Sequence, residues 1–213
     1  MIRHRFFFVL LLFVCAVPSS FAQENDPAKM QAFREEFLAQ FPWTDLCTTA
    51  EDARFLRIMV AGTQARRGVE IGSFTGYGAI YMGMAFERNG GHLFTMEIDP
   101  DTARRCRENI RKVGLEKTVT VMEGDALKLI STLEGQFDFV FIDAKKSDYY
   151  KYFLALKPML KAGTVIVADN VIVSANEMKD FLDAMRTDPD YDMVIIRCTD
   201  QKKDGMAVIY KIK

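Results

Sequence analysis

"VEIGSFTGYGA", residues 69–79, reads as a buried strand that runs into a glycine-rich turn and then into a helix. A turn of this kind at a helix N-terminus is the usual nucleotide-binding place in α/β proteins. Its glycine spacing is G-x-x-x-G-x-G, however, whereas dinucleotide-binding turns carry G-x-G-x-x-G. The stretch therefore predicts an α/β fold, and it leaves open whether the turn holds a ligand or is only a tight turn.

The rest of the chain continues this alternation of strand and helix. The expected strands are 68–72, 92–97, 118–122, 137–142 and 163–168. Such alternation predicts parallel strands joined by right-handed crossovers, and so a doubly wound, Rossmann-like α/β sheet with helices on both faces. Other helices are expected at 27–40, 50–65 and 175–186, and two late runs can close the sheet as an antiparallel C-terminal hairpin, YDMVIIRC and GMAVIYKIK.

The composition is that of an ordinary globular protein. Of the 213 residues, 49% are hydrophobic and 27% are charged, and the formal net charge is -1. This balance indicates neither a nucleic-acid-binding surface nor an acidic tail, so the expected partner is a small molecule. The length suits one domain, expected over residues 23–213. The cysteines of that region are widely spaced and form no metal or disulfide pattern: Cys47, Cys106 and Cys198.

Residues 1–22 are predicted to be a secretory signal peptide. They begin with Arg3 and Arg5, continue with an apolar run, and end in a small-x-small step before Gln23. The apolar run is shorter than the roughly 20 residues that span a bilayer. An uncleaved anchor and a true start near Met30 are the alternatives. The protein is therefore expected to be exported, or cytoplasmic if the start lies downstream.

Polar side chains follow each predicted strand, at the sheet edge where open α/β folds bind ligands. Glu97 lies 25 residues after Gly72, where an acidic side chain can accept hydrogen bonds from both ribose hydroxyls of an adenosine. A nucleoside without phosphates fits this edge better than a dinucleotide, unless Glu97 is only a solvated strand end. The five strand ends carry Glu70 with Gly72, Glu97 with Asp99, Gly124 with Asp125, Asp143, and Asp169 with Asn170.

Asp143, Asp169 and Asn170 offer three oxygen ligands at adjacent strand ends, a set that suits Mg²⁺ or Ca²⁺. Because neighbours in a strand point to opposite faces, Asp169 and Asn170 can reach one ion only if the backbone turns out of the sheet there. Asp and Asn also commonly start turns, which is the structural alternative. Lys145 and Lys146 follow closely, and a lysine beside a cation is suited to act as a general base, although solvated lysine pairs are commoner.

Taken together, the motifs resemble those of a known family. Six of them occur in order over roughly residues 45 to 211: EIGSFTGYGA, TMEIDP, EGDAL, FDFVFIDAKKSDYY, LKAGTVIVADNV and DGMAVIYK. In these motifs the chain is similar to the class I S-adenosylmethionine-dependent, cation-dependent O-methyltransferases, which include catechol and caffeoyl-coenzyme A O-methyltransferases. The resemblance implies a Rossmann-like methyltransferase sheet, S-adenosyl-L-methionine as methyl donor, and a divalent cation.

The resemblance also implies roles for single residues. Asp143, Asp169 and Asn170 would bind the cation, and Lys146 would take a proton from a hydroxyl of a small, catechol-like acceptor during an in-line displacement at the sulfonium methyl. Relatives are often dimers, so a homodimer is one expected assembly. The methyl donor would be held by Thr48, Glu70, Gly72, Phe74, Gly76, Tyr77, Gly78, Met96, Glu97, Asp125, Ala126 and Asp143.

The chain departs from the family pattern in several places. Gly78 stands where many relatives have serine, Lys145 where they have an acidic residue or an aromatic gate, and Cys198 about where catechol-specific members carry a glutamate. The chain also lacks the insertion after Asn170 that shapes the acceptor pocket of coenzyme A-ester methyltransferases, which favours a small, open acceptor site.

Export conflicts with a methyl donor that is made in the cytosol. An exported binding protein that keeps the fold without turnover is therefore the alternative to an enzyme. A nicotinamide-dependent oxidoreductase is disfavoured by the glycine spacing.

Overall fold

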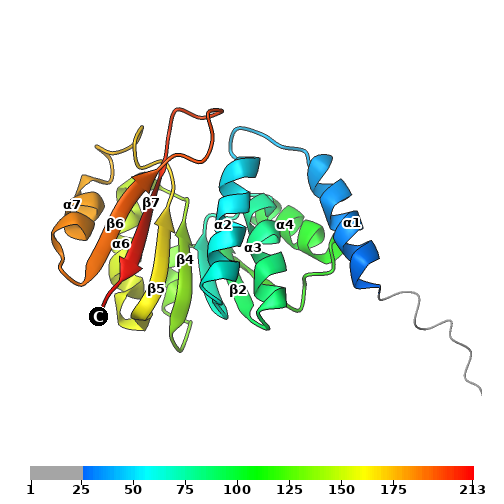
Figure 1. The fold of residues 1–213 in the computed structure, drawn as a ribbon, viewed down its shortest axis with the longest axis horizontal. Coiled ribbons are helices and arrows are strands. Elements are labelled where there is room, and N and C mark those ends of the chain that lie inside the picture. The colour runs from blue at the N-terminus through cyan, green and yellow to red at the C-terminus, as the bar shows by residue number, and fades with distance from the viewer. Residues whose placement is uncertain (1–25) are drawn as a thin grey trace, which may run out of the picture.

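The computed structural model describes residues 26–213, and its centre is a seven-stranded sheet (Figure 1). The strand order is β3-β2-β1-β4-β5-β7-β6. The first five strands in the chain run parallel, and β7 is antiparallel to both β5 and β6. The strands are β1 (Arg67–Ile71), β2 (His92–Glu97), β3 (Val119–Glu123), β4 (Phe137–Ile142), β5 (Leu160–Ala168), β6 (Tyr191–Ile196) and β7 (Met206–Lys211).

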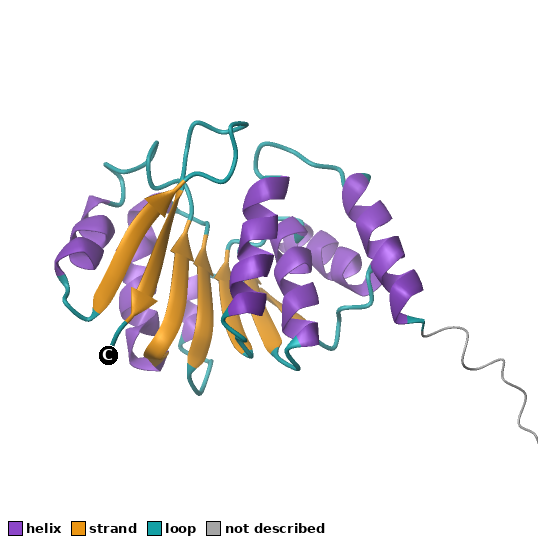
Figure 2. Cartoon of the chain, viewed as in Figure 1, coloured by secondary structure: helices purple, strands orange, loops and turns teal. Residues whose placement is uncertain are grey.

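Helices cover both faces of the sheet, so the predicted doubly wound α/β architecture is confirmed (Figure 2). Buried residues of α1 to α4 pack on one face, and those of α5 to α7 pack on the other. Along β4, Phe139 and Phe141 enter the first core, whereas Val140 and Ile142 enter the second. The helices are α1 (Pro27–Ala39), α2 (Ala50–Gly62), α3 (Tyr77–Arg88), α4 (Pro100–Lys112), α5 (Ala126–Ile130), α6 (Tyr149–Leu156) and α7 (Lys179–Thr187), with short 3₁₀ turns at Lys146–Asp148 and Lys157–Met159.

Two helices begin at capping residues that can be recognised in the sequence. The Asp26 carboxylate accepts from the Ala28 N–H, with Pro27 at the first helical position of α1. The Thr49 hydroxyl accepts from the Asp52 N–H at the start of α2 and donates to the Asp52 carboxylate. These caps fix the starts of α1 and α2, and Thr48, which lines the larger of the two cavities described below, directly precedes the second cap.

The last helix begins later than predicted. Residues 171–178 form turns, and α7 starts at Lys179 rather than at 175. The reason is non-local, because the Asp204 carboxylate accepts from the Ile172 and Val173 N–H groups and the Gly205 carbonyl accepts from the Val171 N–H. The β6–β7 connection, residues 197–205, therefore fixes residues 171–173. The Ala175 and Glu177 N–H groups then donate to the Ile172 and Ser174 carbonyls, so this segment continues in turns.

Other element boundaries differ from the predicted ones by a few residues. α2 ends at Gly62 rather than at 65, β5 begins at Leu160 rather than at 163, and the β6–β7 hairpin closes through a long loop that ends at Asp204 and Gly205. The predicted signal peptide, residues 1–22, lies outside the described residues. Within residues 26–213, no helix has the length and apolar character needed to cross a bilayer.

Candidate active site

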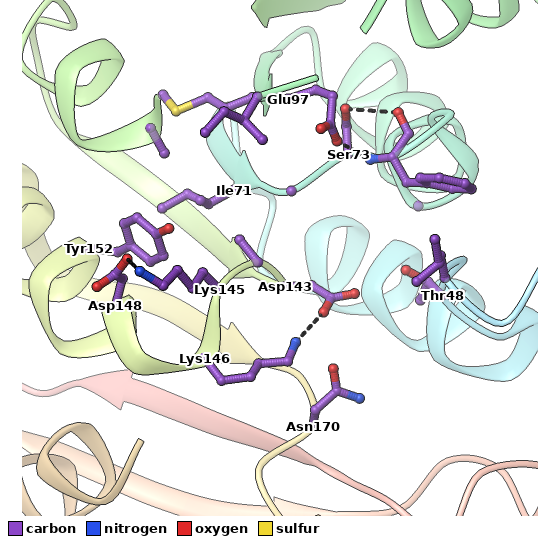
Figure 3. A pocket seen from close by; sticks show the side chains of 18 of the residues that line it. Thr48, Ile71, Ser73, Glu97, Asp143, Lys145, Lys146, Asp148, Tyr152 and Asn170 are labelled. Atoms are coloured by element: carbon purple, nitrogen blue, oxygen red, sulfur yellow. Dashed lines mark hydrogen bonds and ion pairs between the residues drawn. The ribbon is translucent and has the colours of Figure 1, made fainter. Parts of the chain in front are cut away.

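A cavity of about 730 Å³ opens at the carboxyl ends of β1, β2 and β4 (Figure 3). We call it the main cleft. It brings together most of the predicted site residues, from segments far apart in the chain. Those that line it are Thr48, Gly72, Phe74, Tyr77, Gly78, Met96, Glu97, Asp125, Ala126, Asp143, Lys146 and Asn170. The other three are buried and do not line it: Glu70, Gly76 and Asp169.

The glycine turn passes very close to the end of β4. Gly72 has a φ of 94°, and a Cβ atom on it would lie 2.0 Å from the Asp143 carbonyl oxygen. The ends of β4 and β1 are also joined by a hydrogen bond, because the Asp143 N–H donates to the Ile71 carbonyl over 2.9 Å. Only glycine combines this φ with so close an approach. The turn therefore sets Asp143 directly against the first strand.

Glu97 is held by backbone donors and lies at the cleft surface. Its Oε2 accepts from the Phe74 N–H over 2.8 Å, and its Oε1 accepts from the Asp99 N–H over 3.0 Å. Phe74 itself has a φ of 46°, which turns its N–H toward the carboxylate. Each carboxylate oxygen keeps a further lone pair for a ligand. This arrangement suits the recognition of vicinal hydroxyls.

Glu70 is buried beneath the turn rather than at the cleft surface. It is 1% exposed, and the Thr95 hydroxyl donates to its Oε2 over 2.5 Å. Burial raises the pKa of Glu70 to about 8. A Cβ atom on Gly78 would lie 3.0 Å from Glu70 Oε1, so glycine at this position lets α3 begin next to the carboxyl group.

The raised pKa of Glu70 predicts a pH-dependent effect of Glu70→Gln on stability. Between about pH 4.5 and 8 the unfolded chain loses the Glu70 proton while the folded chain keeps it, so wild-type stability falls as pH rises through this window. Glutamine does not titrate. The melting temperature of Glu70→Gln relative to wild type should therefore rise by several degrees from pH 5 to pH 8, at roughly 2–4 °C per kcal/mol.

The control for this measurement is Glu116→Gln, which changes an exposed glutamate. Its melting temperature relative to wild type should stay constant over the same range. A constant difference for Glu70→Gln as well would contradict the burial argument.

Asp125 has a structural function as well as a place in the cleft. Its Oδ1 accepts from the Leu127 N–H over 2.9 Å and so caps α5, whose first residue is Ala126. A cap of this kind fixes the carboxylate and the start of the helix together. Both residues are therefore rigidly presented to the cleft.

Lys146 forms the centre of a partly buried polar network. Its Nζ donates to Asp143 Oδ1 over 2.8 Å and to the Tyr149 hydroxyl over 3.0 Å, and that hydroxyl donates to the Asp169 carbonyl over 3.1 Å (Figure 3 labels Asp143 and Lys146). The Lys146 side chain is 20% exposed, whereas that of Lys145 is 71% exposed and pairs with Asp148. Of the two lysines, only Lys146 points to the strand ends.

The backbone turns out of the sheet at Asn170, which is the condition for Asp169 and Asn170 to reach one ion. β5 ends at Ala168, and Asn170 has a φ of 60°. The Asn170 N–H donates to Asp169 Oδ1 over 2.7 Å. Burial, followed by the negative charge of Asp143, raises the pKa of Asp169 to about 7. The carboxyl groups of Asp143 and Asp169 thus lie close enough to influence each other where β4 and β5 end.

Two side chains in or beside the cleft were not predicted from the sequence. Tyr149 is fully buried and joins Lys146 to the end of β5, although the sequence indicates only an aromatic residue in a helix. Lys202 reaches the cleft from the β6–β7 loop, and its Nζ donates to the Cys47 carbonyl over 3.0 Å. The position of Tyr149, three residues after Lys146, was the one sequence pattern that could have indicated their contact. No sequence pattern indicated that Lys202 reaches the cleft.

Comparison with known proteins identifies the family. Residues 20–203 match the model of a family described as O-methyltransferase. The chain belongs to this O-methyltransferase family. As a family member it is similar to the catechol O-methyltransferase of Niastella koreensis, with 35% identity over 139 residues that cover 63% of this chain and 62% of the relative.

Two further relatives agree with the O-methyltransferase assignment. Caffeoyl-CoA O-methyltransferase 1 of Eucalyptus globulus is 31% identical over 153 residues, which cover 70% of this chain and 61% of the relative. The matches thus span about three fifths of the length of these curated relatives. The crystal structure of the O-methyltransferase TomG from Streptomyces achromogenes, in complex with SAM, matches with a TM-score of 0.75 and 25% identity, over 89% of this chain and 91% of that one.

Proposed function

We propose that the protein transfers a methyl group from S-adenosyl-L-methionine to a hydroxyl of a small, catechol-like acceptor, with the help of Mg²⁺ or Ca²⁺. The observation that carries this proposal is the pairing of Lys146 with Asp143 in the same cleft as the backbone-held Glu97. A base and a nucleoside-recognising carboxylate in one cavity suit the chemistry of the family.

The donor half of the main cleft fits an adenosyl group without phosphates. S-Adenosyl-L-methionine, when bound, supplies an electrophilic methyl group on its sulfonium sulfur. Glu97 would accept from the ribose hydroxyls, and Met96 and Ala126 offer an apolar surface to the adenine. Thr48 and Gly78 border the opposite end, where the methionine part would lie. The SAM complex of the TomG structure supports this reading.

The residues at the ends of β4 and β5 fit a hard divalent cation. Asp143, Asp169 and Asn170 offer side-chain oxygens, the donor type that Mg²⁺ and Ca²⁺ prefer. Within residues 26–213, no group of three or more His, Cys, Asp and Glu side chains is placed to hold a metal, and this set contains only two carboxylates beside the amide. A cation held there would stabilise negative charge on a phenolate oxygen.

Lys146 is suited to remove the proton of the acceptor hydroxyl. Asp143 and the Tyr149 hydroxyl fix the position of its Nζ, so the amine needs little reorganisation to meet a hydroxyl in the cleft. Its neutral form would take the proton as the hydroxyl oxygen attacks the methyl group. In such a displacement the carbon–sulfur bond would break as the carbon–oxygen bond forms, which would leave the donor as an uncharged thioether.

The test measures methyl transfer and donor binding separately. The protein is incubated with methyl-labelled S-adenosyl-L-methionine and a panel of catechols, first with EDTA and then with added Mg²⁺ or Ca²⁺. We expect methylated catechol, a loss of roughly 100-fold in EDTA and recovery with the cation. Calorimetric donor binding without transfer to any catechol would favour the non-catalytic binding protein, and undiminished transfer in EDTA would refute the cation.

We further propose that residues 1–22 direct export and are removed before Gln23. The support is the basic start, the short apolar run and the small-residue step in the sequence. N-terminal sequencing of the protein from fractionated cells tests this proposal. A chain that begins at Gln23 outside the cytosol is expected, whereas a chain that begins near Met30 in the cytosol would overturn it.

A further inference from the structure

A second cavity of about 540 Å³ lies among α1, α2 and α3. It shares one wall with the main cleft, because Tyr77 lines both cavities. Its size falls within the roughly 300–1,000 Å³ range of small-molecule pockets. The proposed methyl transfer makes no use of it. Its principal lining residues are Phe41, Trp43, Arg54, Arg57, Tyr77 and Tyr81.

One side of this cavity is a wall of fixed aromatic rings. The ring centroids of Phe41 and Tyr77 are 5.0 Å apart, and those of Tyr77 and Tyr81 are 5.2 Å apart. All three residues are buried. The half-buried Trp43 is anchored by its indole N–H, which donates to the Thr48 carbonyl over 3.1 Å. Such a wall is complementary to a flat apolar ring.

The other side carries two positive charges on one face of α2. Arg54 and Arg57 are three positions apart and both line the cavity. Among residues 26–213, neither guanidinium lies within ion-pair distance of a carboxylate. Burial, followed by the repulsion of Arg88, lowers the pKa of Arg57.

The one acidic residue of the lining does not pair with these arginines. Glu35 is exposed, and its Oε1 accepts from the Gln31 side chain. Two guanidinium groups beside aromatic rings therefore present unused donors to the cavity. Guanidinium groups bind carboxylates through paired, charge-assisted hydrogen bonds.

We infer that this second cavity binds a planar aromatic carboxylate. The ring of the ligand lies against Trp43 and Tyr81, and its carboxylate meets Arg54 and Arg57. Among the described residues, the site shares only Tyr77 with the main cleft, and it does not depend on methyl transfer by this protein.

Benzoate is a suitable probe because it has no hydroxyl to methylate. Trp43 is the single tryptophan of the chain, so its fluorescence reports on this cavity directly. We expect saturable quenching by benzoate with a dissociation constant on the order of 0.1–1 mM, as suits so small a ligand. Benzamide, which has the same shape without the charge, should bind at least about tenfold more weakly.

Variants locate the probe within the protein. Arg54→Gln and Arg57→Gln should each weaken benzoate binding about tenfold or more, and the exposed position of Arg54 keeps that variant folded. The matched control is Arg105→Gln on α4, which should bind benzoate as wild type does. Saturating S-adenosylhomocysteine should leave the quenching in place.

Three results would overturn the inference. They are an absence of saturable quenching, wild-type affinity in both arginine variants, and loss of the quenching when S-adenosylhomocysteine fills the main cleft. The last result would assign the probe to the donor or acceptor site instead. None of these outcomes depends on whether the protein methylates catechols.

Discussion

Replacing Lys146 with alanine is expected to lower the rate of methyl transfer by roughly 10²–10⁴-fold, the usual contribution of a general base. The reason is geometric, because the Lys146 Nζ is held by Asp143 and Tyr149 at the ends of the strands. Single-turnover transfer measures the chemical step. Donor affinity, measured by calorimetry, should change little, since the residues proposed to contact the adenosyl group lie at or just after the ends of β2 and β3: Met96, Glu97 and Ala126.

Lys145→Ala is the matched control for this prediction. Lys145 is adjacent in sequence, but its side chain is largely exposed and pairs with Asp148. Its removal should change turnover less than tenfold. The proposed function of Lys146 fails if Lys146→Ala retains turnover close to wild type, or if the two variants lose the same amount.

Gly72→Ala is expected to be the most damaging substitution for folding. Alanine at this position would place its methyl group 2.0 Å from the Asp143 carbonyl oxygen, in a backbone with a φ of 94°. The conformation alone costs roughly 1–2 kcal/mol for an L-residue. Separating β1 from β4 to relieve the clash should bring the total loss above about 3 kcal/mol. Urea unfolding measures the free energy of unfolding.

Gly90→Ala separates the two causes. Gly90 also has a positive φ, 66°, but nothing lies within 4 Å of the place that a Cβ atom would take. It should lose only the conformational part. Equal losses in Gly72→Ala and Gly90→Ala would show that the contact with Asp143 does not matter.

Local patterns were sufficient to predict most of the fold. β2 and β4 have the predicted bounds, because each is an apolar run closed by a polar turn. The predicted start of α7 was wrong, because Asp204, distant in sequence, fixes Ile172 and Val173, and the chain continues in turns up to Met178. Boundaries that depend on such long-range partners are not encoded in a local pattern.

The candidate site was likewise predicted where it depends on strand ends, and was not predicted where it depends on burial or on long-range contacts. Residues at strand ends gather in one cleft because parallel strands share an edge, and the turn at Asn170 satisfies the geometric condition derived from the sequence. The burial of Glu70 was not foreseen, since charged side chains are seldom fully buried and no sequence pattern distinguishes this one. The contact of Lys202 with Cys47 joins segments that are 155 positions apart.

The loop of residues 197–205 contacts two separate segments near the cleft. Lys202 ties it to one rim of the cleft, and Asp204 ties it to the opposite segment after Asn170. The glycine turn at Gly72, by contrast, lies so close to the Asp143 carbonyl at the end of β4 that no side chain fits there. Exchange of this one short surface loop would therefore alter both segments that it joins, and it would leave the close contact between Gly72 and Asp143 unchanged.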